Sequence, residues 1–386
     1  MKPLVEAEQA VLGAVLLDPG QLPRLADWLA PAHFSRPVHA ALYAAMLRLR
    51  AGGHPAARGS ADEVPLSWVT DTVAEASRHV RGLTAAYPHA LVAACPHPGH
   101  APAYGRMVLE GAIHRSVAEH AVRLHQAARA DAVRGEVEES LHRARTLAEV
   151  LADLSRRWGT EPRAIAPPGS APAASQFLPP PDEHLLADER HLLGALVERP
   201  AQLDRVVAWL RPEDFAVPAH GRLYRCVAAL HHRGEPVDHL TVLWEAQHRG
   251  LLADGSVTAE QVRDVCSSAA AGSAEYLAQQ VVRASVLRTA AVSARAVQEL
   301  ADDESLSPGR LIGYALHVLE PLAETVRRWQ QATGSSEPPA TARPFPARVA
   351  AARARTRLSP PTRTTRLPAA AAPAASPIRP PHRSRL

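Results

Sequence analysis

An internal duplication constrains the fold of this 386-residue chain more than any other feature of its sequence. Residues 4–55 align with residues 185–236 at a constant offset of 181 and without a gap, and 20 of these 52 positions are identical. The matches include residue types that are scarce in the chain: Gly13 with Gly194, Trp28 with Trp209, Phe34 with Phe215, His39 with His220, and Tyr43 with Tyr224. We therefore expect two copies of one structural unit.

The duplication also indicates where the domains begin and end. The copies diverge after Pro55 and match again near Val108, which aligns with Val281 at an offset of 173, so the first copy is eight residues longer in its middle. We predict four parts: a first copy over residues 4–158, a proline-rich linker over 159–183, a second copy over 184–331, and a tail over 332–386. The tail holds eleven prolines and almost no apolar periodicity, so we expect the linker and the tail to be disordered.

Within each copy the apolar residues follow a helical period. Val11, Leu12, Val15 and Leu16 share one helix face, and residues 22–29 repeat that spacing. Breaks fall at Asp18-Pro19-Gly20 and at the short turns Pro31-x-x-Phe34 and Pro212-x-x-Phe215. Further helices are predicted over residues 39–50, 220–232 and 240–247, the last with Asp238 as its N-cap.

Two helical hairpins complete the predicted fold. Residues 103–130 with 133–158, and 274–301 with 308–329, are two pairs of long predicted helices, and each pair is joined by a short turn. No alternating strand pattern is present, and the aromatic content of 4% is typical of a chain without sheets. The predicted fold class is all-α: two tandem domains, each a helical bundle followed by a hairpin. The matched aromatic residues Trp28, Phe34 and Tyr43 are expected in the core.

The lysine count excludes several classes of enzyme. Lys2 is the only lysine, and no glycine-rich loop precedes it. The chain therefore lacks the P-loop lysine that contacts nucleotide phosphates. Schiff-base and kinase lysine chemistry are excluded for the same reason. We expect no ATP hydrolysis, no catalytic residue and no cofactor, although an enzyme with a site of unfamiliar pattern stays open.

Four polar clusters have the residue types of a site, but each has a structural interpretation. Cys95-x-His97-x-x-His100 lacks a fourth ligand and the paired spacing of a zinc knuckle, so no metal is expected. His231-His232 is placed at a helix C-terminus, and Glu8 and Glu189 at helix starts, where the helix dipole favours their charges. Asp302-Asp303-Glu304 is expected to be a solvated turn.

Cysteine usage and hydropathy indicate the cellular compartment that we expect for this protein. Three cysteines cannot build a disulfide framework, no apolar run approaches the roughly 18 residues that span a bilayer, and residues 11–17 do not have the pattern of a signal peptide. We expect a cytoplasmic protein without membrane contact, with association with the nucleoid left open.

The tail carries the chain's excess of positive over negative charge. The chain has a net charge of +4, but residues 332–386 hold ten arginines and one acidic residue, which leaves a mildly acidic body. Arginines that are candidates for contacting nucleic acid are Arg353, Arg355, Arg357, Arg363 and Arg366. Phe345 is the only aromatic residue there, so base stacking would be sparse. Non-specific nucleic-acid binding through this tail is the alternative function.

The residues Glu6-x-Glu8-Gln-Ala-Val-Leu-Gly13-Ala-Val-Leu-Leu-Asp18-Pro19 resemble the opening of the N-terminal domain of DnaB-type replicative DNA helicases. The following Pro-x-x-Phe and His-x-x-Leu-Tyr patterns, and Gly234-Glu-Pro-Val-Asp238 of the second copy, are also similar to that domain. The resemblance covers about residues 4–158 and 184–330. It implies an all-helical bundle with a hairpin, which pairs with copies of itself as a collar on the hexameric motor and contacts primase and loader proteins.

Two departures from that family limit what the resemblance implies. No RecA-like motor follows the domain in this sequence, and the first copy lacks the Pro-Val-Asp stretch and carries an insertion around residues 60–65. We therefore interpret the chain as a protein-interaction module of DNA replication or repair, with a replicative helicase, primase or helicase loader as partner. The hairpins at 103–158 and 274–329 are expected to pair within the chain, although two independent domains on a flexible linker remain the alternative.

Overall fold

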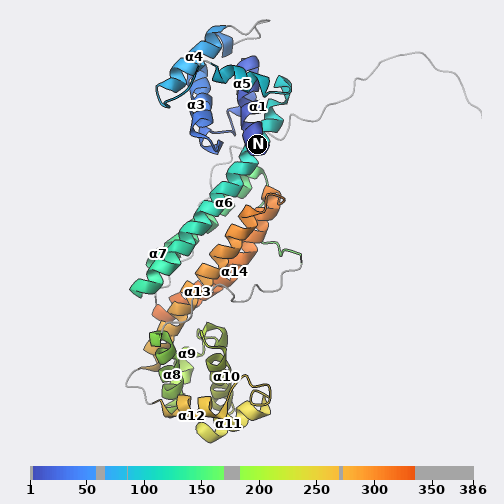
Figure 1. Cartoon of the computed structure of the whole chain (residues 1–386). Helices are drawn as coiled ribbons and strands as arrows, with labels where there is room; N and C mark the ends of the chain where they lie inside the picture. Colours follow the sequence, from blue (N-terminus) through green and yellow to red (C-terminus); the bar gives the residue numbers. More distant parts are fainter. Residues whose placement is uncertain (1–2, 58–65, 85, 169–182, 269–272, 335–386) are drawn as a thin grey trace, which may run out of the picture. The chain divides into compact units, whose positions relative to one another are not determined.

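The computed structural model describes residues 3–57, 66–84, 86–168, 183–268 and 273–334 (Figure 1). Within these ranges the regular structure consists of fourteen α-helices and six 3-10 helices, with no strand. The all-α prediction is confirmed. Residues 169–182 of the expected linker, and the expected tail from residue 335 onward, lie outside the described residues.

The first copy begins with a bundle of short helices that encloses its own apolar core. Its α-helices are α1 (Pro3–Leu17), α2 (Leu22–Leu25), α3 (Pro37–Ala51), α4 (Leu66–Ser77) and α5 (Tyr87–Ala93). The helix expected over residues 22–29 is only one turn long. Ala30 is extended because Pro31 follows it, and hydrogen-bonded turns connect α2 to that proline.

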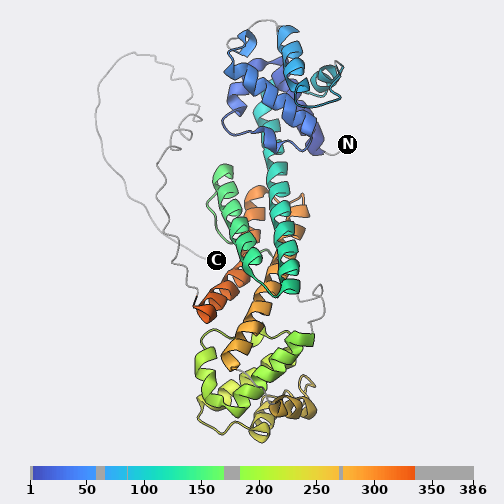
Figure 2. The same ribbon diagram turned by 90° about the vertical axis from the view of Figure 1, so that its left-hand side faces the viewer.

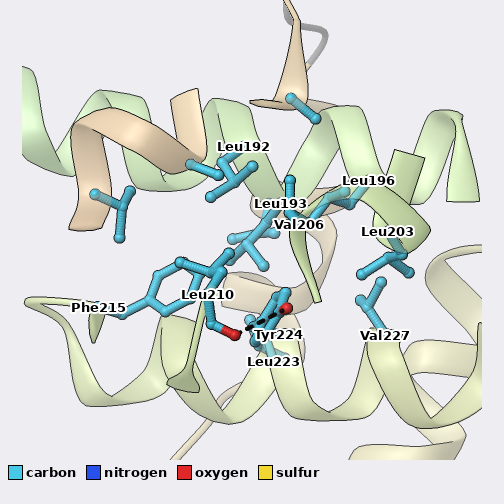
Figure 3. Packing of buried hydrophobic residues seen from close by; sticks show 14 of the residues in the cluster. Leu192, Leu193, Leu196, Leu203, Val206, Leu210, Phe215, Leu223, Tyr224 and Val227 are labelled. Atoms are coloured by element: carbon cyan, nitrogen blue, oxygen red, sulfur yellow. Dashed lines mark hydrogen bonds between the residues drawn. The ribbon is translucent and has the colours of Figure 1, made fainter. Parts of the chain in front are cut away.

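The second copy repeats this bundle with its own core. Its helices are α8 (Glu183–Glu198), α9 (Leu203–Val206), α10 (Pro218–His232), α11 (His239–His248) and α12 (Ala259–Ser267). Asp238 caps α11 as predicted, accepting hydrogen bonds from the backbone N–H groups of Leu240 and Thr241. Figure 3 shows the leucines of α8 packed over α10, where the Tyr224 hydroxyl donates to the Leu210 carbonyl at 3.4 Å.

The matched glycines permit close helix approach in both copies. A Cβ on Gly13 of α1 would overlap the carbonyl oxygen of Leu91 in α5. A Cβ on Gly194 of α8 would likewise overlap the carbonyl oxygen of Ser268, just after α12. Glycine at these two positions therefore lets one helix lie directly against the backbone of another.

Each bundle leads into a long helical hairpin, and both hairpins are confirmed (Figures 1 and 2). The first consists of α6 (Ala101–Arg134) and α7 (Glu138–Trp158), and the second of α13 (Ala274–Asp302) and α14 (Pro308–Thr333). Both first helices are longer than predicted. Gly135 ends α6 in the left-handed region, with φ of 72°, which a residue without a Cβ adopts readily.

The predicted aromatic core is confirmed at most of the matched positions. Phe34, Tyr43, Phe215 and Tyr224 are buried, and in each copy the two rings of the pair contact each other. Trp28 is the exception. Its partner in the second copy, Trp209, is only 6% exposed, whereas Trp28 is half-buried at the junction of the bundle core and the hairpin.

Candidate protein-interaction surfaces

The two hairpins contribute to one shared apolar cluster. Ile113, Val117 and Leu124 of α6 belong to the same buried cluster as Val286 and Val297 of α13. Small residues on both helices, Ala121 and Ala128 on α6 and Ala290 and Ala294 on α13, are buried in it. Since α6 and α13 come from different copies, the contact that the sequence analysis expected between the hairpins is present in the structure.

Polar contacts fix the register of α6 against α13. The Nδ1 of His114 lies 2.9 Å from the Ala301 carbonyl oxygen, and its Nε2 lies 3.0 Å from that of Leu306. Further along, His125 Nδ1 lies 3.3 Å from the Ala291 carbonyl oxygen. Numbers rise on α6 as they fall on α13, so the two helices are antiparallel. No pattern in the sequence singled out either histidine for this role.

The residues after α7 strengthen the contact between copies. The backbone N–H of Ile165 donates to the Gly313 carbonyl of α14 at 3.0 Å. The Ile165 side chain covers Gly313, where a Cβ would lie 2.8 Å from Ile165 Cδ1. The start of the expected linker is therefore held against the second copy.

The prediction that Glu8 and Glu189 lie at helix starts is wrong, because α1 begins at Pro3 and α8 at Glu183. Both are fully buried within α1 and α8, and both accept from the segment that leads into the third helix of their copy. Glu8 Oε2 lies 2.7 Å from His39 Nδ1, and Glu189 Oε2 lies 2.7 Å from His220 Nδ1. An unpaired buried carboxylate is costly. The Glu and His residues that match at the offset of 181 therefore form the same stabilising pair in both copies.

The electrostatics of Glu8 favour the carboxylate form. Burial by itself would raise the pKa of Glu8. Hydrogen bonds from His39 and from the Ser35 N–H outweigh burial and hold the pKa below its ordinary value. The pair continues to Tyr87, whose hydroxyl lies 2.7 Å from His39 Nε2. These contacts join α1, α3 and α5.

The second copy has a buried carboxylate, Asp214, at a position where the first copy has none. Asp214 accepts from Arg328 of α14, from Ser285 Oγ of α13 at 2.8 Å, and from its own turn at the Arg211 N–H. Arg288 donates to the Asp214 carbonyl oxygen. The first copy has His33 at the matching position. No sequence motif pointed to Asp214. The available signal was that the two copies differ here, with Asp214 in one and His33 in the other.

The remaining clusters behave as structural features. Among the described residues no group of three His, Cys, Asp or Glu side chains could hold a metal ion. His97 caps its own turn by accepting from the Gly99 N–H, and its ring stacks on His100. Burial raises the pKa of the Cys95 thiol, which opposes the thiolate form that metal binding needs.

The predicted turn and helix-end residues are confirmed in place. His231-His232 ends α10, with His231 Nε2 lying 2.9 Å from Asp204 Oδ1. The acidic residues 302–304 are exposed. The five candidate nucleic-acid arginines, Arg353, Arg355, Arg357, Arg363 and Arg366, lie outside the described residues.

Comparison with known proteins places both bundles in one family. The family model described as the DnaB-like helicase N terminal domain matches residues 2–110 and again residues 182–283, together more than half of the chain. This chain belongs to the DnaB-like helicase N-terminal domain family. The resemblance expected from the sequence is thereby confirmed for both copies.

Individual relatives of this DnaB-like chain are helicases of greater length. The chain is 39% identical over 83 residues to the replicative DNA helicase DnaB of Mycobacterium leprae, covering 22% of this chain and 14% of that protein. It is 35% identical over 124 residues to the replicative DNA helicase DnaB of Geobacillus stearothermophilus, covering 32% and 25%. The chain therefore spans a quarter or less of the length of these relatives.

A solved structure also resembles the DnaB-like chain. The crystal structure of the N-terminal domain of DnaB helicase from Mycobacterium tuberculosis is 31% identical, covering 41% of this chain and 99% of that one, with a TM-score of 0.29. None of the described helices is long and apolar enough to cross a membrane.

Proposed function

We propose that this chain is a binding module of the replication machinery, in which two DnaB-like N-terminal domains act as one particle. The observation that supports the proposal is the contact of α6 with α13, which places two family domains in one shared apolar cluster on one chain. Two domains joined by a tether and an apolar contact are preorganised, so a partner pays little ordering entropy on binding both.

The partners proposed are a replicative helicase, a primase or a helicase loader. We expect such a pseudo-dimer of collar-like domains to compete with, or cap, a helicase collar. The proposed mechanism is binding in the cytoplasm through helical faces, without catalysis or cofactor.

Partner binding is tested with the full chain and with a chain that ends at Gly334, just after α14. Each is mixed with purified helicase, primase and loader of the same cell and followed by size-exclusion chromatography. We expect at least one partner to co-elute with both chains. If removal of residues 335–386 abolishes all binding, the tail and not the pair of helical domains binds the partner, and the proposal is wrong.

Absence of nucleotide hydrolysis is a separate prediction. The chain has one lysine, Lys2, and no glycine-rich phosphate loop. Purified protein with ATP, Mg²⁺ and single-stranded DNA should release phosphate at the background rate. A protein-dependent rate that a substitution in either copy abolishes would refute the non-enzymatic proposal.

The second candidate function is non-specific DNA binding by the tail, favoured by ten arginines and the absence of acidic residues over 338–386. Binding of this kind weakens steeply as salt rises, because each phosphate contact releases a counterion. Fluorescence anisotropy with single-stranded DNA at increasing salt should show that slope for the full chain and no binding for the chain ending at Gly334. Sequence-selective or salt-insensitive binding would contradict it.

A further inference from the structure

The two copies differ at the junction between bundle and hairpin. In the first copy this junction holds a pocket of about 510 Å³. Its lining residues are Trp28, Pro102, Ala103, Arg106, Leu109, Arg157 and Trp158. Two tryptophans and two arginines therefore surround one concavity, and none of the lining residues is acidic.

At the matching positions of the second copy, contacts hold the end of α14 against the bundle and against the start of α13. The Arg-Trp pair at the end of α14, Arg328-Trp329, matches Arg157-Trp158 at the end of α7. Arg328 is buried and donates to the Trp209 carbonyl at 3.1 Å and to the Asp214 carboxylate. Gln279 donates to the Ala332 carbonyl at 2.8 Å, which fastens the end of α14 over the start of α13.

Substitutions at two positions explain why the first copy stays open. His33 stands where the second copy has Asp214, so Arg157 has no buried carboxylate at this position to pair with. Burial, together with the positive charges of Arg157 and Arg115, lowers the pKa of His33, which favours the neutral ring. Arg157 instead lies at the surface, 59% exposed, with its Nε 2.7 Å from Asp153.

The second difference is on α6. Arg106 stands where α13 has Gln279 at the offset of 173. Its guanidinium lies over the Trp158 ring, 5.9 Å from the ring centroid, rather than fastening the end of α7. Close packing of α6 on Trp28 is possible because residue 105 is glycine. A Cβ added at this position would lie 2.8 Å from Trp28 Cη2.

The lining specifies the chemistry of an occupant. Leu109, Pro102 and Ala103 provide an apolar wall that suits a bulky apolar side chain. Arg106 and Arg157 are both exposed, and the ion pair of Arg157 with half-exposed Asp153 is weak enough to exchange for a ligand carboxylate. Arginine is the residue that binds carboxylates in a bidentate manner.

Charge also excludes the nearest alternatives. Residues 338–386 of the same chain hold ten arginines and no acidic residue, so they lack the carboxylates that would pair with Arg106 and Arg157. Single-stranded nucleic acid needs a basic groove that follows several phosphates. Here two arginines flank a single concavity.

We propose that this pocket is a docking site for a peptide segment of a partner protein, in which a bulky apolar side chain is flanked by Asp or Glu. The inference deepens the proposed binding function and rests on it. The apolar side chain enters between Trp28 and Trp158, and the flanking carboxylates pair with Arg106 and Arg157. Divergence of the copies at positions 33 and 106 has thus opened one of two duplicated junctions for recognition.

The test is selection of a random twelve-residue peptide display library on the full chain, followed by fluorescence anisotropy with the enriched peptides. We expect enrichment of apolar residues flanked by acids. Arg106→Gln and His33→Asp, which install the residues of the second copy, should each weaken binding about tenfold, since each removes one charged contact. Arg123→Gln, an exposed arginine on the same helix paired with Glu119, is the matched control and should bind as the native chain does.

Three results would overturn the proposal. They are a library without an acidic–apolar consensus, enriched peptides that bind Arg106→Gln and His33→Asp unchanged, and an oligothymidine that competes for the pocket. Thermal unfolding of each variant verifies that it is folded, and Arg106→Gln changes only an exposed side chain. If helicase, primase or loader binds Arg106→Gln as tightly as the native chain, the binding function survives and only the pocket fails. If none of them binds the native chain, the proposed function fails independently of the peptide result.

Discussion

At the residue scale, the buried Glu8–His39 pair makes stability dependent on pH. The pKa of Glu8 is lower in the folded chain than its ordinary value of 4.5, because His39 and the Ser35 N–H donate to the carboxylate. The folded state therefore binds fewer protons than the unfolded state. The stabilisation is fully present above about pH 4.5 and is lost as pH falls through the lower folded pKa.

Substitution of this carboxylate tests that linkage. Glu8→Gln should lower the free energy of unfolding at neutral pH by about 3 kcal/mol, the magnitude typical of breaking a buried pair. The variant should also lose part of the acid sensitivity below pH 4.5. Urea unfolding at a series of pH values measures both effects, with Glu6→Gln on the exposed face of α1 as the control. An equal pH slope in native and variant proteins would contradict the assignment.

At the element scale, the contact of α6 with α13 depends on small residues. The His114 and His125 contacts set an antiparallel register that brings Ala294 opposite Ala121, and both are fully buried. Helices approach closely only where side chains are short, so a larger side chain at this level must separate them.

Ala294→Leu is expected to destabilise the chain by about 1–3 kcal/mol, the usual cost of overpacking a filled core. Thermal unfolding measures the loss, and scattering should show a larger radius of gyration. Glu299→Leu adds a leucine to an exposed position of the same helix and serves as the control. Unchanged stability of Ala294→Leu would mean that the helices are not packed at this level.

At the scale of the whole molecule, pairing of the copies predicts a monomer of one compact body. The shared cluster, the histidine contacts and the Ile165–Gly313 bond all join residues of different copies within one chain. Small-angle scattering should give a monomer mass at every concentration and a single distance distribution for the described body. Two separated masses with a broad distribution would rule out the pairing.

Much of this architecture was determined by the sequence alone. The offset of 181 revealed the duplication, because scarce residues such as Trp28 and Tyr43 recur only when a packed core is copied. Apolar spacing and proline positions predicted the helices, since both act through the local backbone. The hairpins also followed from local signals. Their pairing was expected because long amphipathic helices need to bury a further apolar face, but the choice between pairing and two independent domains came from the structure.

The tertiary structure decided what depends on residues far apart in the chain. The local pattern placed Glu8 at a helix start, and only the folded chain shows it buried beside His39. The pocket depends on the difference between His33 and Asp214. Asp214 binds Arg328 in the second copy, whereas His33 offers no carboxylate to Arg157, and each arginine lies more than a hundred residues further along the chain. Local pattern carries the information for helices, whereas burial and the pairing of charges are properties of the assembled core. The same sequence repeat could therefore predict one fold twice, while only the packed structure shows that Arg328 is buried against Asp214 in the second copy and that Arg157 stays at the surface in the first.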